Sequence, residues 1–332
     1  MAIPTKKRVF SAAQPTGDPH IGNYLGALKQ WVALQAAGNK VFAMIADLHA
    51  ITAPYEARAL PEMMVQTAAV LLAVGIDPNK TTIFVQSHVS AHAEAAWLLT
   101  TITPYGELTR MTQFKEKGVK QKAVGAGLFA YPILMAADIL LYQTELVPVG
   151  EDQLQHLEFS RTLARKFNQQ FGQTVTEPKA FLLKETARVM SLADPTRKMS
   201  KSDPPASTLA LLDSPDAIRK KLRSAVTDSG TAVNPERLGP ALTNLLTLYA
   251  AFADTTIQAV AEQFAGKGYA VFKDALADLL AEKLGPIRTR ATDFLKDPKA
   301  LYATLARGAE KAAPIAYGTL AKMKEHMGLT PS

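Results

Sequence analysis

The chain has 332 residues, 48% of them hydrophobic, and a formal net charge of +7, so it can bury a sizeable core and form two domains. It contains no cysteine, which excludes disulfides, thiolate chemistry and cysteine-ligated zinc, and which fits a reducing cytoplasm. The first ten residues lack the apolar core of a secretion signal, so we expect none.

The first half of the chain alternates strand-like and helix-like segments. Short runs rich in β-branched residues predict strands at 8–13, 40–47, 81–87 and 145–150. The segments with helical periodicity are 22–37, 60–75 and 91–102. This alternation predicts an α/β fold, in which a parallel sheet is covered by helices on both faces. Ligands of such sheets bind outside the carboxyl ends of the strands.

The segment TGDPHIGNYLGAL, which follows the first predicted strand, holds the first candidate site. Pro19 favours a turn, and the spacing of Ile21 and Leu25 predicts a helix that begins near Gly22. Gly22 permits close approach to the backbone, while His20 and the free amides of the first helical turn can face an anion. The alternative is an ordinary turn with a surface histidine.

The most apolar stretch, AVGAGLFAYPILMAADILLY at 123–142, carries Asp138 near its end and Pro132 in its middle. Because no polar pattern flanks it, we expect a buried helix or a subunit interface rather than a membrane span. A buried carboxylate is costly unless it is hydrogen-bonded, so Asp138 is a candidate ligand-binding group. The alternative is a paired or helix-capping aspartate.

Positive charge is concentrated between Arg161 and Arg223, where 13 Lys or Arg face 6 Asp or Glu. Such an excess is typical of phosphate binding, in a nucleotide or a nucleic acid, although a solvated helical face has the same composition. Within it, KMSKS follows the strand-like VMSL and places Lys198 and Lys201 among small hydroxyl residues. Such a loop can fold over a polyphosphate, or it is simply an exposed basic loop.

Beyond residue 207 the pattern is almost entirely helical. Ser214 as N-cap followed by Pro215 predicts a helix start, with a buried stripe formed by Ile218, Leu222 and Val226. The basic residues of this helix, which we expect to face elsewhere, are Arg219, Lys220, Lys221 and Arg223. Further helices are expected at 241–253, 255–265, 269–284, 286–295 and 298–327.

Together, PHIGN and KMSKS resemble the two signature motifs of the class I aminoacyl-tRNA synthetases. Four longer segments are similar to the bacterial tryptophanyl-tRNA synthetases: SAAQPTGDPHIGNYLGALKQW, GELTRMTQFKEK, YPILMAADILLY and VGEDQLQHLEFSRTLARKFN. The resemblance covers essentially the whole chain. It implies a Rossmann-like catalytic domain over 1–205, a smaller all-helical anticodon-binding domain over 206–297, and a C-terminal helical segment, 298–332, that packs back on the catalytic domain. It also implies a cytoplasmic homodimer.

The resemblance further assigns an ATP site at the matching positions. The residues with implied catalytic roles are His20, Asn23, Lys117, Lys198, Ser200 and Lys201. Those expected to border ATP in addition are Gln14, Pro15, Thr16, Gly22, Gly150, Glu151, Asp152, Val189, Met199 and Ser202. His20 would touch the phosphates, and the two loop lysines would close on the pyrophosphate with help from Lys117. Mg²⁺ would accompany ATP, with no metal site made by the protein alone.

For the amino acid, the resemblance implies that Asp138 accepts the indole N–H. Indole offers one donor and no acceptor, so an acceptor in an apolar cavity suits it. The other residues expected in this pocket are Met135, Tyr131, Phe10, Val147, Val149, Gln153 and His49. Gln153 would meet the ammonium or carboxylate end. His49 follows a predicted strand. It can lie at the edge of the active site or have no role in the site, and the sequence favours neither alternative.

The other histidines and the tryptophans have simpler interpretations. His88 and His92 have the spacing of a metal pair, but no third ligand lies nearby in the sequence, so a structural or surface role is favoured. His156 is expected to cap or pair on a helix together with Glu158. Both tryptophans, at positions 31 and 97, are expected to be packing residues.

The implied reaction joins tryptophan to ATP, giving tryptophanyl-adenylate and pyrophosphate, and then transfers the amino acid to the 3′ end of tRNA(Trp). The attacking carboxylate is already ionised near neutral pH, so no general base is required. Three alternatives remain open: a tyrosyl-tRNA synthetase, a synthetase-like binding protein without aminoacylation, and a small adenylyltransferase. The last alternative explains neither KMSKS nor the helical second half.

Overall fold

The computed structural model describes residues 3–111, 125–150, 153–182, 188–201 and 203–329. Its centre is a parallel five-stranded sheet with the strand order β3-β2-β1-β4-β5. The strands are β1 (Arg8–Ala13), β2 (Lys40–Ile45), β3 (Thr81–Val85), β4 (Leu146–Val149) and β5 (Lys179–Leu182). The chain adds strands on one side of β1 and then crosses to the other side, so the switch point lies between β1 and β4.

The four predicted strands are present, shortened by at most two residues at an end. β5 was not predicted because KAFL is short, contains no β-branched residue, and buries only Phe181. The strand-like VMSL forms no strand. Met190 instead pairs with Lys198 in an isolated antiparallel bridge, which belongs to a hairpin outside the sheet.

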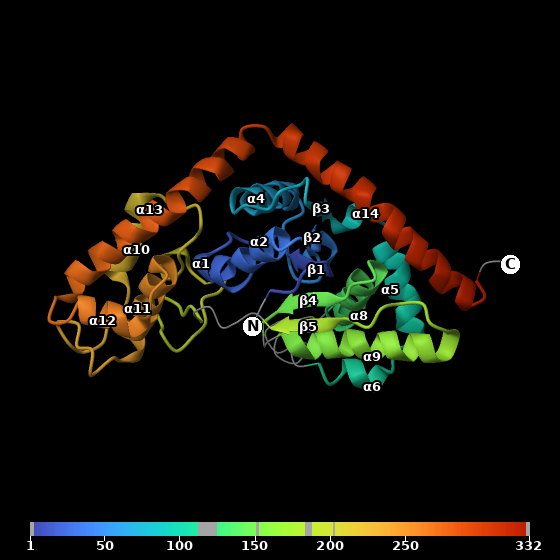
Figure 1. Cartoon of the computed structure of the whole chain (residues 1–332), viewed down its shortest axis with the longest axis horizontal. Coiled ribbons are helices and arrows are strands. Elements are labelled where there is room, and N and C mark those ends of the chain that lie inside the picture. The colour runs from blue at the N-terminus through green and yellow to red at the C-terminus, as the bar shows by residue number, and fades with distance from the viewer. Residues whose placement is uncertain (1–2, 112–124, 151–152, 183–187, 202, 330–332) are drawn as a thin grey trace.

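Helices cover both faces of the sheet, as the alternation of segments predicts (Figure 1). On β2, Ala43 and Ile45 pack with α4 (Leu60–Ala73), while Phe42 and Met44 pack with α5 (Ala91–Ile102) and α8 (Ala126–Leu141). The predicted helix 22–37 is divided into α1 (Ile21–Asn23), a π-helical turn η1 (Tyr24–Leu28) and α2 (Lys29–Ala36). π-Helical turns of this kind are frequent near functional sites.

The apolar stretch around Asp138 is the buried helix α8, which packs between α5 and α9 (Leu154–Phe171). In the described part of the chain, no helix combines the length and the apolar character that crossing a membrane requires. The described part of this half also contains the short helices α3 (Asp47–Ala50) and α6 (Tyr105–Leu108) and the 3-10 turn η2 (Gln86–His88).

The second half is built from α10 (Pro215–Ser224), α11 (Pro240–Ala253), α12 (Ile257–Gln263), α13 (Tyr269–Leu295) and α14 (Pro298–His326). The predicted N-cap of α10 is confirmed, because the Ser214 side chain accepts a hydrogen bond from the N–H of Ala217 at 3.2 Å. The prediction that Val226 is buried is wrong. Val226 lies beyond the end of α10, where helical periodicity no longer applies, and it is 44% exposed.

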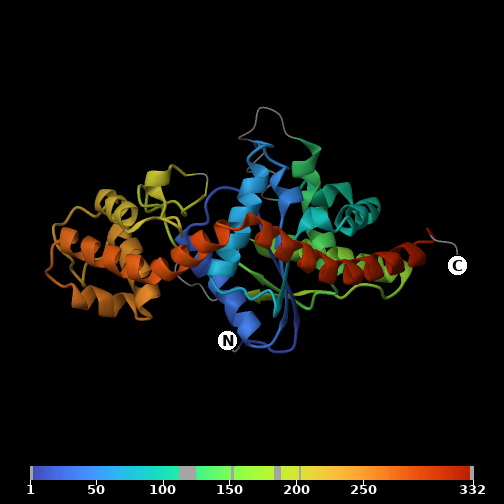
Figure 2. The ribbon, with the colours of Figure 1, turned by 90° about the horizontal axis from the view of Figure 1, so that it is seen from above.

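The prediction of two helices over 269–295 is also wrong, because α13 continues through Pro286. Proline removes one intrahelical hydrogen bond, but buried residues on both sides of it, Leu284 and Ile287, keep one apolar face against the core that includes α4. α13 and α14 meet at the apex of the molecule. From there α13 extends toward α10–α12, and α14 extends in the other direction, past β3 and α5 (Figures 1 and 2).

α14 lies against β3, and Gly308 permits the contact. A Cβ added at Gly308 would lie 1.7 Å from the carbonyl oxygen of Ile83, a distance that no side chain could adopt. The same helix also contacts α4, α5 and α8. The last long helix therefore joins the helical half of the chain to the edge strand of the sheet.

Candidate active site

A cavity of about 1080 Å³ opens at the carboxyl ends of β1 and β4, at the switch point of the sheet. It collects residues from β1, the turn before α1, α3, α8, β4 and the hairpin that carries KMSKS. The sequence-predicted residues that line it are Phe10, Gln14, Thr16, His20, Gly22, Asn23, His49, Tyr131, Met135, Asp138, Val147, Val149, Gly150, Gln153, Val189, Lys198, Met199, Ser200 and Lys201. Pro15 is not among the lining residues. Lys117, Glu151, Asp152 and Ser202 lie outside the described residues.

His20 caps the helix that begins the site. Its Nδ1 accepts a hydrogen bond from the N–H of Gly22 at 3.1 Å, and its own N–H donates to Asn23 Oδ1 at 3.0 Å, which forms a reciprocal capping box. A Cβ at Gly22 would lie 2.9 Å from the imidazole ring, so glycine lets this ring lie over the turn. The predicted ATP contact Asn23 therefore has a local structural role as well.

The environment of His20 keeps its imidazole neutral. Burial, followed by the charges of Lys201 and Lys198, lowers the pKa of His20 to about 4, against the opposing effect of Asp203. Because Nδ1 accepts from Gly22, the ring proton lies on Nε2. His20 can thus offer an N–H donor to an anion in the cavity without carrying a charge itself.

The turn before α1 is tied to the chain just beyond KMSKS. The N–H of Ile21 donates to the carbonyl of Leu209, and the N–H of Leu211 donates to the carbonyl of Pro19, both at 2.9 Å. His20 and Ala210 form an antiparallel bridge between these two bonds. Two segments almost 190 positions apart in the sequence are thereby held side by side.

KMSKS closes a backbone hairpin at the mouth of the cavity. Ser191 donates to the carbonyl of Arg197 at 2.8 Å, and Met199 donates to that of Val189 at 3.0 Å. Lys201 Nζ donates to the carbonyl of Gln14 at 3.3 Å, across to the end of β1. Within the described part of the chain, neither Lys198 nor Lys201 forms an ion pair.

Burial lowers the pKa of Lys201 to about 8, while the nearby charge of Asp18 opposes this shift. The ammonium group is therefore partly desolvated, and it forms no ion pair with a carboxylate of the described residues, although Asp18 is near enough to affect its pKa. A polyphosphate that entered the cavity would supply the missing negative charge. Lys198 is exposed at the rim of the same hairpin.

Asp138 lies at the opposite, closed end of the cavity and is only 1% exposed. His49 Nε2 donates to Oδ2 at 2.7 Å, His92 Nδ1 donates to Oδ1 at 2.6 Å, and Gln86 Nε2 donates to Oδ1 at 2.8 Å. Burial alone would raise the pKa of Asp138, but the hydrogen bonds from both histidines outweigh it and lower the pKa to about 2. The carboxylate is therefore held ionised and fixed.

Three donors leave one acceptor position on this carboxylate. An ionised carboxylate has about four lone-pair sites, and Oδ2 uses only one of its two on the described donors. Asp138 is thus paired, as one alternative from the sequence has it, and still lines the cavity as an acceptor. A ligand with a single N–H donor and an apolar body matches that end.

The tautomer of His92 is set by Tyr142. Burial, with a smaller contribution from Asp138, raises the pKa of the Tyr142 phenol, which therefore keeps its proton and donates to His92 Nε2 at 2.8 Å. The His92 ring proton consequently lies on Nδ1, where it is donated to Asp138. The Tyr142 ring in turn stacks on Phe10 at 5.5 Å between ring centroids.

Gln86 and His92 were not among the predicted site residues. Gln86 directly follows β3, at the edge of the sheet where ligands bind, and that position was a usable signal. For His92 the sequence offered only a metal-like spacing with His88, and the structure separates the two: His92 is fully buried and His88 is exposed. In the described ranges, no group of three or more His, Asp or Glu side chains is arranged so that it could hold a metal ion.

The remaining sequence-predicted positions have simple contacts. His156 Nε2 and Tyr131 Oη lie 2.5 Å apart, and Glu158 pairs with Arg161 at 2.6 Å, so both His156 and Glu158 pair as the sequence suggested. Trp31 is a buried packing residue. Trp97 is not, because 67% of its surface is exposed on the outer face of α5.

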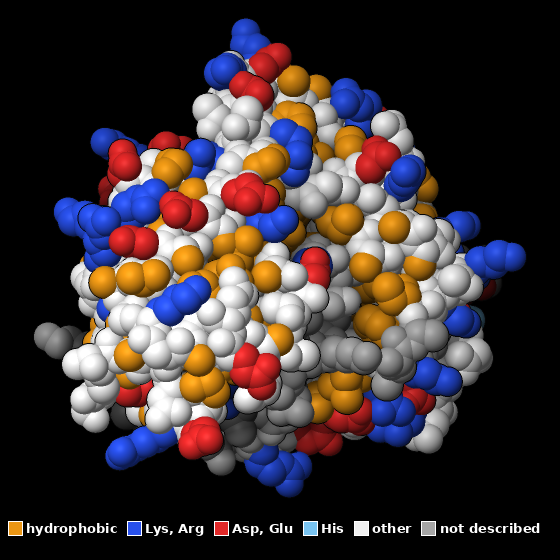
Figure 3. All heavy atoms as spheres, turned by 60° about the vertical axis from the view of Figure 1, so that its left-hand side comes forward, with side chains coloured by type: hydrophobic (Ala, Val, Ile, Leu, Met, Phe, Trp, Pro, Cys, Tyr) orange, Lys and Arg blue, Asp and Glu red, His pale blue; other side chains and the backbone are white. Residues whose placement is uncertain are grey.

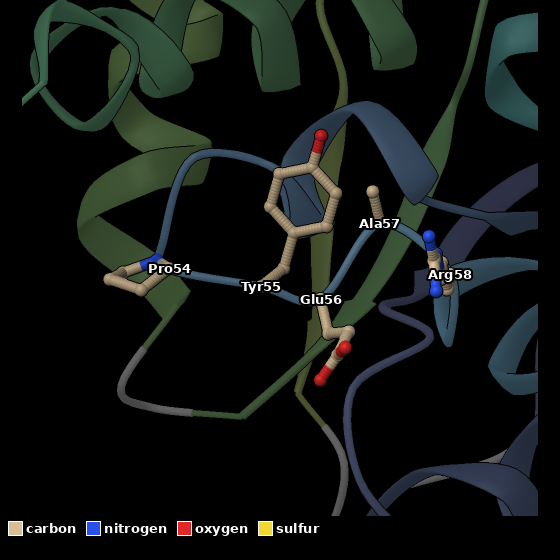
Figure 4. A pocket seen from close by; sticks show the side chains of 5 residues that line it. All are labelled: Pro54, Tyr55, Glu56, Ala57 and Arg58. Carbon is tan, nitrogen blue, oxygen red and sulfur yellow. The ribbon is translucent and has the colours of Figure 1, made fainter.

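A second, smaller hollow is lined only by Pro54, Tyr55, Glu56, Ala57 and Arg58. Figure 4 shows these side chains along one loop, with Tyr55 and Glu56 on opposite sides of it. The lining comes from five consecutive residues and includes none of the predicted site residues. The large cavity is therefore the candidate active site.

The basic helix α10 is less available for a nucleic acid than its composition indicates. Lys221 pairs with Asp213 at 2.7 Å, Arg219 with Asp278 at 2.8 Å, and Arg223 with Asp274 at 3.2 Å. Figure 3, which brings the helical end forward, shows basic and acidic side chains interspersed there. Its surface therefore mixes charges of both signs.

Comparisons with known proteins agree with this geometry. The family model described as tRNA synthetases class I (W and Y) matches residues 4–285. The tryptophan–tRNA ligase of Caldanaerobacter subterraneus subsp. tengcongensis is 50% identical over 325 residues, which are 97% of this chain and 98% of that protein.

Two solved structures are similar over nearly their whole length. The tryptophanyl-tRNA synthetase of Mycoplasma pneumoniae superposes with a TM-score of 0.88 at 34% identity, covering 98% of this chain and 99% of that one. That of Campylobacter jejuni, complexed with ADP and tryptophan, superposes with a TM-score of 0.86 at 36% identity, covering 97% and 100%.

Proposed function

The chain belongs to the class I tRNA synthetases of the W and Y family, and we propose from this premise how its site joins tryptophan to tRNA. It is a tryptophan–tRNA ligase, which activates L-tryptophan with ATP and transfers it to the 3′ end of tRNA(Trp). One observation carries the assignment of roles: the His20 turn and the lysine hairpin meet at the mouth of a cavity whose closed end is Asp138.

At the closed end, Asp138 Oδ2 accepts the indole N–H of tryptophan. Phe10, Met135, Val147 and Val149 surround the ring, because they line the same cavity and offer apolar surface. A ring that does not place a donor at Asp138 leaves a desolvated carboxylate oxygen unpaired, which costs about 1–3 kcal/mol. His49 lies beside Asp138, to which it donates at 2.7 Å, and Tyr131 lines the pocket next to His49. Gln153 meets the ammonium or carboxylate group of the amino acid.

In the first step a tryptophan carboxylate oxygen attacks the α-phosphorus of ATP, which arrives as its Mg²⁺ complex. A bond forms between that oxygen and phosphorus, the bond from phosphorus to the bridging oxygen breaks, and pyrophosphate leaves with the electron pair. No proton has to be removed, since the carboxylate is ionised. Catalysis then rests on positioning and on stabilising the charge of the transferring group.

His20, Lys198 and Lys201 supply that stabilisation. His20 donates from Nε2 to a phosphate oxygen, while the two lysines approach the β- and γ-phosphates from the hairpin, with Ser200 and Lys117 assisting. Gln14, Thr16, Gly22, Asn23 and Gly150 border the nucleotide, together with Val189 and Met199 on the adenine side. Pro15, Glu151, Asp152 and Ser202 complete the proposed ATP contacts.

In the second step the terminal adenosine of tRNA attacks the carbonyl of the adenylate through a ribose hydroxyl, and AMP leaves. We assign anticodon contacts to the helical domain, residues 206–297, and the catalytic domain to residues 1–205. The acid pairs of α10 would have to open for Arg219, Lys221 and Arg223 to reach phosphates, so Lys220 and the later helices are the better candidates. Charged tRNA is used in protein synthesis, so the reaction belongs in the cytoplasm.

We further propose that two copies of the chain form a homodimer. α8 itself is largely buried within one copy, but aromatic side chains beside it are exposed: Trp97 at 67% and Tyr105 at 73%, the latter packed on Phe129 of α8. Exposed aromatic side chains are enriched at interaction sites between proteins. Analytical ultracentrifugation should give a dimer at micromolar concentration, and a stable monomer would contradict this part of the proposal.

The decisive experiment is ATP–pyrophosphate exchange by the purified protein. We expect exchange that depends on tryptophan, with tyrosine at least about a thousandfold less effective in kcat/KM because the site must match donor position and ring size together. Exchange driven equally by tyrosine would contradict the role of Asp138, and no exchange with either amino acid would contradict activation altogether.

A further inference from the structure

The lysine hairpin is anchored to the helical half of the molecule through one buried side chain. Asn244, on α11, is 5% exposed. Its Oδ1 accepts from the N–H of Met190 at 2.9 Å, and its Nδ2 donates to the carbonyl of Met190 at 3.0 Å. The side-chain amide thus pairs with both backbone groups of one hairpin residue, as a neighbouring strand would.

Met190 is also the residue that pairs with Lys198 across the hairpin. Its neighbour Val189 accepts from the N–H of Met199, so the inner arm of the hairpin directly supports the arm that carries both lysines. The position of Met190 therefore determines where Lys198 lies. Lys201 follows three residues later and reaches the carbonyl of Gln14.

The position of Asn244 is itself well determined. The Asp228 carboxylate accepts from the N–H groups of Ala241 and Leu242 at 3.2 and 3.1 Å, which caps the first turn of α11. Two residues after Met190, the N–H of Leu192 donates to the carbonyl of Ser207, and the carbonyl of Leu192 accepts from the N–H of Val226, both at 2.9 Å. The inner arm is thereby bonded on one side to the lysine arm and on the other to the helical half.

Packing alone does not account for an amide at this position. The flanking residues Leu242, Leu245 and Leu246 are buried, and leucine has a better helix propensity than asparagine. A leucine at 244 would bury apolar surface, but it would leave the N–H and carbonyl of Met190 without their partner. The amide is suited to holding the hairpin backbone.

We propose that Asn244 is a positioning residue for adenylate formation: it holds Met190, and through Met190 it sets Lys198 and Lys201 over the phosphates. The proposal rests on the roles given above to these two lysines. Asn244 touches neither substrate, so it acts only through the hairpin. The helical half thereby contributes to the first step of the reaction, which does not require tRNA.

The first test compares two substitutions with a control on the same helix. Asn244→Leu removes both bonds to Met190, whereas Asn244→Asp keeps the acceptor for its N–H and places a second acceptor opposite its carbonyl. Thr247→Val is the control, because the Thr247 hydroxyl donates only within α11, to the carbonyl of Thr243 at 2.7 Å. The readouts are kcat and KM for ATP in pyrophosphate exchange, the Kd for tryptophan, and the melting temperature.

We expect Asn244→Leu to lower kcat about tenfold to a hundredfold, because small misplacements of charged groups cost that much. Asn244→Asp should fall between Asn244→Leu and the unaltered protein, Thr247→Val should match the unaltered protein, and the tryptophan Kd should stay within about twofold. A merely structural role would lower the melting temperature of Asn244→Leu and leave kcat per titrated active site unchanged, which would overturn the proposal.

The second test measures how readily trypsin cleaves the hairpin, and it does not depend on enzymatic activity. Trypsin cleaves after Arg197, Lys198 and Lys201, and mass spectrometry can follow the first cut in the native protein. Asn244→Leu should speed cleavage within 197–201 at least about threefold relative to Thr247→Val, because the hairpin opens more often. Equal cleavage rates would overturn the proposal.

Lys201→Ala separates this proposal from the function on which it rests. Full exchange activity of Lys201→Ala would overturn the role of the lysine pair, and the catalytic role of Asn244 with it. An inactive Lys201→Ala beside a fully active Asn244→Leu would overturn the Asn244 proposal alone.

Discussion

The two ends of the cavity treat charge in opposite ways. Asp138 at the closed end is a buried carboxylate that already receives three hydrogen bonds, two of them from histidines that are themselves buried. Lys201 at the mouth is a partly buried ammonium that donates a hydrogen bond to a backbone carbonyl and forms no ion pair within the described chain. Before any ligand binds, the Asp138 carboxylate already has hydrogen-bond donors from the protein, whereas the Lys201 ammonium has no ion-pair partner among the described residues.

The difference follows from what each end has to do. A recognition group must present one acceptor in one place, so preorganisation by surrounding donors favours it. A group that stabilises charge developing on a phosphoryl group is most effective when its strongest interaction forms only in the transition state. Burial lowers the pKa of Lys201, and the charge of Asp18 opposes this shift only in part, whereas the pKa of Asp138 is lowered, against the effect of burial, by hydrogen bonds from His49 and His92.

The largest expected effect is at the mouth. Lys201→Ala should lower the kcat of pyrophosphate exchange about a hundredfold to a thousandfold, the size of effect seen when one preorganised donor is removed from an active site. Its tryptophan Kd should remain within about twofold, since the closed end is untouched. Lys322→Ala, an exposed lysine on α14, is the matched control. If Lys201→Ala formed the adenylate at an unchanged rate, the role that distinguishes the mouth of the cavity from its closed end would be contradicted.

The next effect is at the closed end. Asp138→Asn should raise the KM for tryptophan roughly tenfold to a hundredfold, because the amide cannot accept from His49, His92 and Gln86 and still present the same oxygen to indole. The KM for ATP should change little. Asp254→Asn, at an exposed aspartate, serves as the control. An unaltered tryptophan KM would mean that Asp138 has only a structural function.

The pH dependence should differ between the two ends. Lys201 is a cation below its pKa of about 8 and loses its charge as the pH rises through that value, so kcat/KM for ATP should fall about tenfold per unit at higher pH. Tryptophan affinity should stay flat between about pH 6 and 9, because Asp138 remains ionised throughout. Lys201→Arg should move the alkaline limb upward. A tryptophan Kd that followed the same alkaline limb would contradict the distinction.

The smallest predicted effect sharpens the account of the Asp138 cluster. Tyr142→Phe removes the hydroxyl that fixes the His92 tautomer but keeps the ring stacked on Phe10. We expect the tryptophan KM to rise about twofold to fivefold with kcat unchanged, because the lost hydrogen bond acts on Asp138 only indirectly, through His92. Tyr317→Phe removes a comparable but exposed hydroxyl and should have no effect.

Much of the site was predictable because its residues lie in local patterns with a physical meaning. His20 and Gly22 follow a strand and open a helix, and Asp138 interrupts the most apolar run of the chain. Helix boundaries marked by capping residues, such as Ser214, were predicted for the same reason. The continuous helix through Pro286 was not, because its buried contacts outweigh the local preference for a break.

The residues that sequence reasoning missed act through partners far along the chain. His92 shares a two-histidine spacing with His88, yet its contacts are Asp138 and Tyr142, about 50 positions away. In the sequence, Asn244 is only a polar residue within an apolar helix. Its significance depends on its two hydrogen bonds to Met190, which the structure places beside it. The sequence predicts that the basic residues of α10 face away from its buried stripe, but it does not indicate that three of them pair with acids.

The strand–helix alternation, the helix starts and the kinds of group available for binding depend on neighbours a few residues apart, so local sequence patterns predict them. Which of those groups meet, which lose water and which are already paired depends on how distant segments fold together. Hydrogen-bond partners and burial are set by chain segments far apart in the sequence, 187 positions in the case of Lys201 and Gln14, and they determine which charges already have partners within the protein.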